Sequence, residues 1–146
     1  MNRNKRTGIW LAIAIIAIAG AAFGYYLYNK GPMDVAHASS EKIGAAALYA
    51  AFLSDSSAAF KNYSGKVLTV SGTVAQVSNN QEGQQLILLN TSTEGAHVNC
   101  TMETPVPNAQ AGEQLNIKGI CSGIGQGDAD LGIPGDVYIT RSIQEK

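Results

Sequence analysis

The most distinctive feature of the hydrophobic pattern is a long apolar run near the N-terminus. Residues 9–28 are twenty residues of almost unbroken apolar character, and no charged side chain occurs between Arg6 and Lys30. A helix of about 20 residues crosses the roughly 30 Å hydrocarbon core of a bilayer. The pattern therefore predicts one N-terminal transmembrane helix.

The charges that flank this run predict its orientation. Arg3, Lys5 and Arg6 precede the run, whereas only Lys30 follows it closely. Because basic residues remain on the cytoplasmic side of a span, we expect residues 1–30 to form a cytoplasmic N-terminus and a single-pass anchor in the inner membrane. The rest of the chain then lies in the periplasm or outside the cell.

A cleaved signal peptide is the alternative interpretation, since small residues at 17–19 and 19–21 follow a basic start. The apolar region of a signal peptide runs only about 7 to 15 residues. The run in this chain is longer and ends in Tyr25, Tyr26 and Tyr28, whose amphipathic rings favour a membrane interface. A retained anchor is therefore the preferred interpretation.

A linker and a helix are predicted after the anchor. Residues 31–43 have turn-forming residues and no apolar periodicity, which predicts a linker, and the domain then occupies residues 44–146. Within 44–62 apolar residues recur near the helical period of 3.6. These residues are Ala47, Leu48, Ala51, Phe52, Ala59 and Phe60. Three serines, at positions 54, 56 and 57, predict a bend or a break in this helix.

Beyond this helix the period changes to two, which indicates strands with one buried face. Five strands are predicted, at 66–77, 84–89, 96–102, 115–121 and 136–143. A connection with Pro105 and Pro107 separates the third strand from the fourth, because proline lacks the backbone donor that a sheet requires. Three strands, a long connection and two further strands predict a mainly β fold, a five-stranded Greek-key barrel of the OB type with one preceding α-helix.

Several short segments support this fold by resemblance. They are Ala47-Leu48 with Phe52, the segments Lys61-Asn62-Tyr63-Ser64-Gly65-Lys66-Val67 and Val70-Ser71-Gly72-Thr73-Val74, and then Val98-Asn99-Cys100 and Lys118-Gly119-Ile120-Cys121-Ser122-Gly123. Over residues 44–143 the chain resembles the tRNA_anti-like OB-fold family of small bacterial envelope-type proteins. The resemblance implies a signal or anchor segment, one helix and an OB barrel, and it supplies no catalytic residue.

The two cysteines suggest a covalent link. Cys100 and Cys121 both lie on inward faces of predicted strands. Because the space outside the inner membrane is oxidising, we expect a disulfide between them, with two separate buried thiols as the alternative. His97 and Cys100 lie on opposite faces of one strand, so they do not form a nucleophile and base. No set of acid, base and nucleophile converges, and we expect neither enzymatic activity nor a cofactor.

The loop between the last two strands contains three carboxylates among glycines, at Asp128, Asp130 and Asp136. Oxygen clusters of this kind can hold Ca²⁺. An EF-hand loop would also need a polar residue at Gly132 and a glutamate at Ile139, and both are absent. A solvated loop is preferred over a metal site.

The outward strand positions are the candidate ligand contacts. They are Thr69, Thr73, His97, Asn99, Thr101 and Tyr138. OB barrels that hold single-stranded nucleic acid use a basic groove with aromatic platforms. Residues 31–146 contain six Lys and Arg against eleven Asp and Glu, a net charge of −5. The sequence therefore favours a module that binds an envelope protein, a peptide or a small polar ligand.

Single-stranded nucleic-acid binding remains the alternative function. It would regain support if the structure placed Lys66, Lys118 and Arg141 in one groove, because phosphate binding depends on clustered cations.

Overall fold

The chain consists of two units. The computed structural model describes residues 3–31 and 33–146, so Met1, Asn2 and Pro32 of the predicted anchor and linker lie outside the described residues. The first unit spans Met1–Met33 and the second spans Asp34–Lys146. The folded domain therefore begins ten residues before the predicted start at residue 44.

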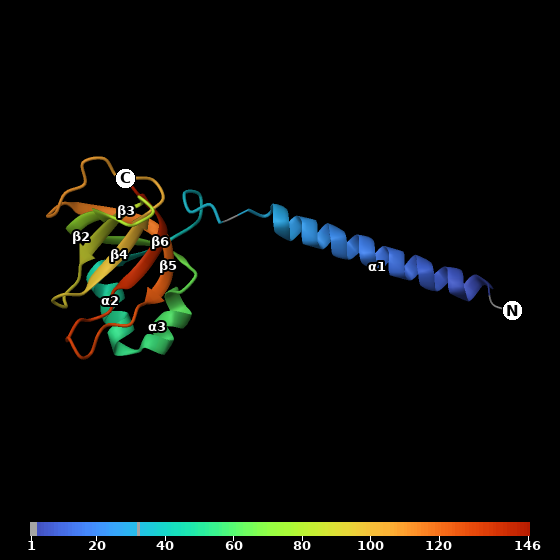
Figure 1. The fold of residues 1–146 in the computed structure, drawn as a ribbon, viewed down its shortest axis with the longest axis horizontal. Coiled ribbons are helices and arrows are strands. Elements are labelled where there is room, and N and C mark those ends of the chain that lie inside the picture. Colours follow the sequence, from blue (N-terminus) through green and yellow to red (C-terminus); the bar gives the residue numbers. More distant parts are fainter. Residues whose placement is uncertain (1–2, 32) are drawn as a thin grey trace. The chain divides into compact units, whose positions relative to one another are not determined.

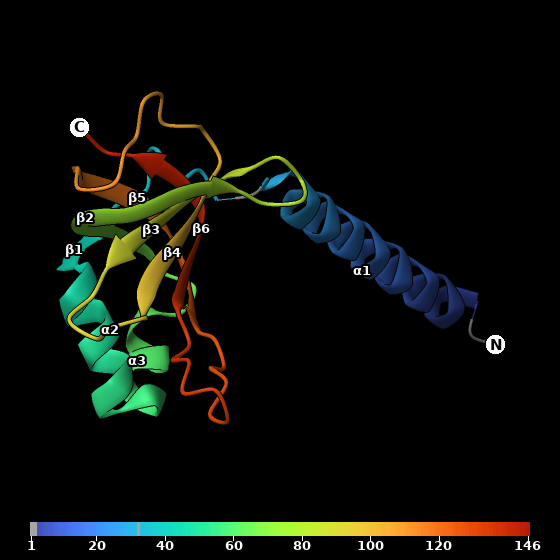
Figure 2. The same cartoon turned by 60° about the vertical axis from the view of Figure 1, so that its left-hand side comes forward.

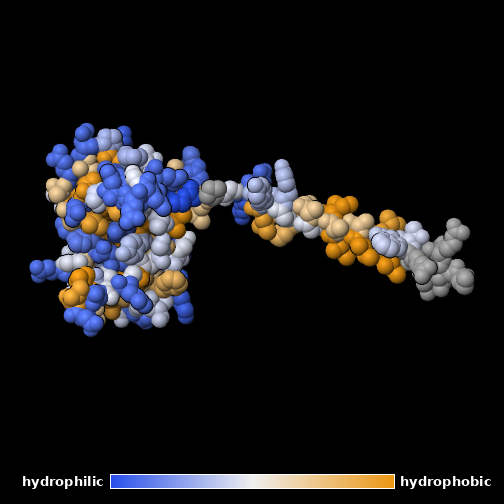
Figure 3. Space-filling view, in the orientation of Figure 1, coloured by the Kyte–Doolittle hydropathy of each residue, from blue (hydrophilic) through white to orange (hydrophobic). Residues whose placement is uncertain are grey.

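Helix α1 (Arg3–Asn29) makes up most of the first unit. Its segment Thr7–Asn29 has 23 residues and a mean hydropathy of 2.1, and none of the apolar window is buried within the protein. The side of α1 seen in Figure 3 is apolar along much of its length. The helix is long and apolar enough to cross a membrane, a property that it shares with signal sequences near an N-terminus.

Two helices open the compact part of the domain. Helix α2 (Ala45–Ser54) and helix α3 (Ser56–Tyr63) are separated at Asp55, whose φ of −151° is not helical. The Asp55 carboxylate accepts a hydrogen bond of 3.0 Å from the backbone N–H of Ala58, which caps α3. The predicted break in this region is confirmed, and an aspartate between the serines causes it.

Five strands form the closed barrel. They are β2 (Val67–Asn79), β3 (Gln85–Asn90), β4 (His97–Met102), β5 (Gln114–Ile124) and β6 (Val137–Gln144). Around the barrel the order is β2, β3, β4, β6, β5, and β5 pairs again with β2. All pairs in this ring are antiparallel except β4 with β6. Helices α2 and α3 lie at one end of the barrel (Figures 1 and 2). The predicted OB-type fold is confirmed.

The long strand β2 takes part in both halves of the barrel wall. Its first half pairs with β5 and its second half with β3. At Gly72, near the end of the first half, an added Cβ would lie 3.0 Å from Ala45 Cβ and 3.2 Å from Leu89 Cβ. Glycine at this position therefore allows the start of α2 to pack closely on the bend of the strand.

A sixth strand, β1 (Glu41–Gly44), lies outside the ring and pairs in parallel with β2. It ends a segment, residues 34–44, that we call the strap. Residues 34–43 of the predicted linker, 31–43, fall in the second unit. Their sequence is short and polar, so only the pairing with β2 reveals them as structured.

Side-chain contacts also fix the strap to the barrel. Val35 is only 3% exposed. The Lys118 Nζ donates a hydrogen bond of 3.2 Å to the carbonyl of Ala36, and the hydroxyls of Ser40 and Thr69 lie 2.7 Å apart in a hydrogen bond. The domain is thus covered on one side by the segment that follows α1 in the chain.

The structure does not support the predicted disulfide. Cys100 and Cys121 are both free and buried. In the pairing register each is opposite Ile139, so strand β6 lies between them. Neighbouring strands are about 4.8 Å apart, which separates the two Cα atoms by about 10 Å, beyond the roughly 7 Å limit for a disulfide. The alternative of two separate buried thiols holds.

We expect neither thiol to react with a maleimide in the native protein. Burial raises the pKa of both thiols, and the thiolate is the reactive form. Both should be labelled once the protein is unfolded without reductant. Mass spectrometry of the intact chain counts the labels. An unlabelled chain that is lighter by two hydrogens would indicate a disulfide and contradict the prediction.

Candidate functional site

The outer surface of β3, β4 and β6 gathers most of the predicted ligand contacts. We call it the β3–β4–β6 face. Cross-strand pairing defines two rows of outward residues. One row contains Gln76, Leu88, Asn99 and Tyr138, and the other contains Ser78, Leu86 and Thr101. OB-folds bind oligonucleotides and oligosaccharides on the face of their second and third barrel strands, which are β3 and β4 here.

Leu86 and Leu88 are members of this face that the sequence analysis did not identify. Both are half-buried. Ile87, which lies between them, and Leu89, which follows Leu88, are fully buried in the core. The run of four apolar residues conceals the alternation, so the outward positions follow only from the register with β2 and β4. Two leucines side by side on the outside of a barrel provide an apolar contact surface.

Asn99 gives this face a polar centre. Among the side chains of residues 7–31 and 33–146, its Oδ1 is the one buried oxygen or nitrogen atom without a hydrogen-bond partner. In the strand register Asn99 is opposite Leu88 of β3 on one side and Tyr138 of β6 on the other. Buried polar atoms in proteins nearly always have a partner. The oxygen is buried, so a ligand would reach it only after the neighbouring side chains move apart.

Tyr138 is the exposed aromatic residue of the face, with 41% of its surface accessible. Its ring lies against the backbone of Gly125, where an added Cβ would be 2.6 Å from Tyr138 Cε2. Glycine at 125 thus provides the space in which the ring packs on the β5–β6 loop. This contact restricts the ring to the side of β6 next to β5.

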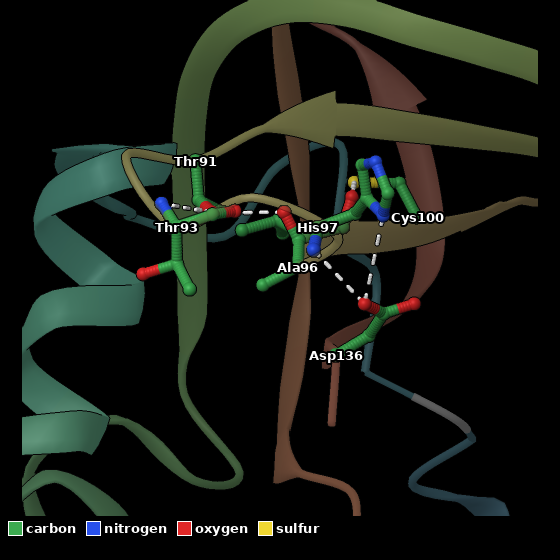
Figure 4. A network of polar contacts seen from close by, with 7 residues as sticks. Thr91, Thr93, Ala96, His97, Cys100 and Asp136 are labelled. Carbon is green, nitrogen blue, oxygen red and sulfur yellow. Dashed lines mark hydrogen bonds and ion pairs between the residues drawn. The ribbon is translucent and has the colours of Figure 1, made fainter. Parts of the chain in front are cut away.

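A polar network closes one edge of the face (Figure 4). The backbone N–H of His97 donates a hydrogen bond of 2.9 Å to Asp136 Oδ1, and His97 Nδ1 lies 3.7 Å from the same oxygen. The Thr91 hydroxyl donates to the carbonyl of Ala96 at 2.8 Å. These contacts connect the start of β4 to the start of β6, so Asp136 has a structural role.

Two predicted ligand contacts lie elsewhere. Thr69 is only 3% exposed because the strap covers it, and its hydroxyl is bonded to Ser40. Thr73 donates a hydrogen bond of 3.1 Å to Gln114 Oε1 on β5. The structure therefore brings His97, Asn99, Thr101 and Tyr138 together and leaves both threonines on another part of the barrel wall.

The predicted carboxylates Asp128 and Asp136 of the β5–β6 loop have separate hydrogen-bond partners. Asp128 Oδ1 accepts hydrogen bonds from the backbone N–H groups of Asp130 and Leu131, which forms a tight turn. Asp136 is bonded to His97 instead. In the described part of the chain, no three His, Cys, Asp or Glu side chains gather as a metal ion would require.

The basic residues do not form one groove. Lys118 is buried under the strap and Lys66 lies before β2, at the end next to α3. Arg141 is the one Lys or Arg within β3, β4 and β6, and its Nη2 lies 3.3 Å from Glu103 Oε1. These three side chains therefore do not form the cationic groove that would favour the nucleic-acid alternative.

Comparison with known proteins agrees with this fold. The tRNA_anti-like family matches residues 1–130, and the chain belongs to that family. None of the curated proteins matches the chain. A putative aspartyl-tRNA synthetase from Leishmania major Friedlin is similar over 78% of this chain, with 9% sequence identity and a TM-score of 0.43. The chain spans 22% of that synthetase, and a likeness at this level carries no functional argument.

Proposed function

We propose that this protein is a membrane-anchored, non-enzymatic binding module of the bacterial cell envelope. In this proposal α1 anchors the chain in the inner membrane with its N-terminus in the cytoplasm, and the OB barrel lies on the other side. The β3–β4–β6 face binds a protein or peptide segment. The apolar length of α1 and the basic residues before it support the anchor.

The observation that carries the proposal is the composition of the β3–β4–β6 face. Leu88 and Tyr138 flank Asn99 in the strand register, Leu86 lies on the same face, and the one arginine of these strands is paired with Glu103. An apolar surface whose one arginine is already paired with a carboxylate matches a peptide, which offers apolar side chains. A phosphate backbone would instead require clustered cations.

Photo-crosslinking in the native membrane tests the proposal. Tyr138 is replaced by benzoylphenylalanine in the full-length chain, and Phe60, an exposed aromatic on α3, receives the same group as a matched control. We expect a discrete protein adduct from position 138 and not from position 60. Adding Leu88→Ala should reduce the adduct severalfold, since the apolar area that this half-buried leucine buries on binding contributes roughly 1 to 2 kcal/mol.

Two results would contradict this function. One is an adduct pattern that is the same from both positions. The other is binding of a labelled single-stranded oligonucleotide with a submicromolar Kd at about 150 mM salt, where non-specific binding is typically no tighter than roughly 10⁻⁴ to 10⁻⁶ M. A steep loss of that affinity with added salt would establish the nucleic-acid alternative.

A further inference from the structure

A concave site lies on a part of the barrel wall outside the β3–β4–β6 face. It is a cavity of about 150 Å³ between β1, the first half of β2, β5 and the segment after β6. Its lining is polar and consists of Lys42, Thr69, Ser71, Asn116, Glu145 and Lys146. The strap builds one side of it, because Lys42 belongs to β1 and pairs with Thr69.

The backbone places these side chains at fixed positions. Ser71 and Asn116 are cross-strand partners on β2 and β5. The backbone N–H of Glu145 donates a hydrogen bond of 2.9 Å to the carbonyl of Asn116, which holds the segment after β6 against the same strand. The two strands and the strap thus bring groups from distant parts of the sequence to one cavity.

Most of the lining groups have no competing partner. Thr69 is bonded to Ser40, but the side chains of Lys42, Ser71, Asn116 and Glu145 make no hydrogen bond or ion pair with any residue that the structure describes. Two lysines and one glutamate therefore line a small space together with a serine and an asparagine that have no other side-chain partner.

We propose that this cavity binds a small zwitterion, a free amino acid. The ammonium groups of Lys42 and Lys146 attract its carboxylate, and the Glu145 carboxylate accepts hydrogen bonds from its ammonium group. The Ser71 hydroxyl and the Asn116 amide complete the hydrogen bonding. A phosphate dianion would meet the same cations, but Glu145 would repel it.

The size of the cavity limits the ligand. A water molecule occupies about 30 Å³, so the space holds roughly five groups of that size. Drug-sized ligands and nucleotides need sites of about 300 to 1,000 Å³. Glycine, alanine and serine are of the appropriate size.

Titration of the full-length chain in detergent, followed by backbone amide NMR shifts, tests the site. We expect glycine and alanine to produce saturable shifts near Lys42, Ser71, Asn116 and Glu145, with a Kd of about 1 mM, near −4 kcal/mol, as suits a ligand of few atoms. Lys42→Met and Glu145→Gln should each weaken binding about tenfold. The matched control Lys61→Met changes an exposed lysine on α3 and should leave binding unchanged.

Acetate and methylammonium, which each carry half of the zwitterion, should bind more weakly than glycine. Three outcomes would overturn the proposal. They are no saturable shift up to about 50 mM, far above the expected Kd, tighter binding of inorganic phosphate than of glycine at the same residues, or unchanged binding in both variants. None of these outcomes affects the β3–β4–β6 face, because Asn99 and Tyr138 are not part of the cavity.

Discussion

Replacing Phe52 with alanine should lower the free energy of unfolding by about 3 to 5 kcal/mol. Phe52 on α2 is only 2% exposed and belongs to the hydrophobic core. Its ring centroid lies 6.3 Å from that of Tyr63, which is partly buried against the same core. The substitution removes these contacts and leaves a cavity between the helices and the barrel. Since a small domain is stable by only about 5 to 15 kcal/mol, the loss is a large fraction of the total.

Phe60→Ala is the matched control. Phe60 lies on α3 and is 56% exposed, with its ring partly against Gly123. We expect this substitution to cost less than about 1 kcal/mol, as exposed positions usually do. Urea unfolding followed by circular dichroism measures both variants in detergent. Equal losses for the two variants would show that α2 does not provide the core contact described here.

The second large effect concerns the apolar helix. If Thr7–Asn29 anchors the protein, the mature chain keeps its first 30 residues and stays in the membrane after an alkaline wash. Deleting residues 7–29 should transfer the protein almost completely to the soluble fraction. Intact mass and fractionation measure these outcomes. A mature form that begins near Ala21 would replace the anchor with a cleaved signal peptide.

A thiol-labelling experiment can report on which side of the membrane the domain lies. Ser57→Cys introduces an exposed thiol on α3, while Cys100 and Cys121 are buried. A membrane-impermeant maleimide added outside intact cells should label this variant and not the parent chain. Labelling that requires the inner membrane to be broken would place the domain in the cytoplasm and contradict the proposed location.

Local patterns in the sequence were enough to predict the elements. The apolar run predicts α1, and the alternating residues predict the five barrel strands. Both patterns are local, because each depends on how the side chains of one segment are divided between apolar and polar surroundings. The break between α2 and α3 was also predicted locally. Asp55 supplies its cap from a neighbouring position in the chain.

Only the tertiary structure decides which segments become neighbours. An alternating pattern shows that Cys100 and Cys121 point inward, but it does not show that β6 inserts between their strands. The same holds for the strap, whose four-residue strand forms only because β2 has an open side there. Leu86 and Leu88 likewise become a surface only through the register of β3. Strand pairing is made by backbone hydrogen bonds between distant segments, and these bonds leave no local mark on side-chain periodicity.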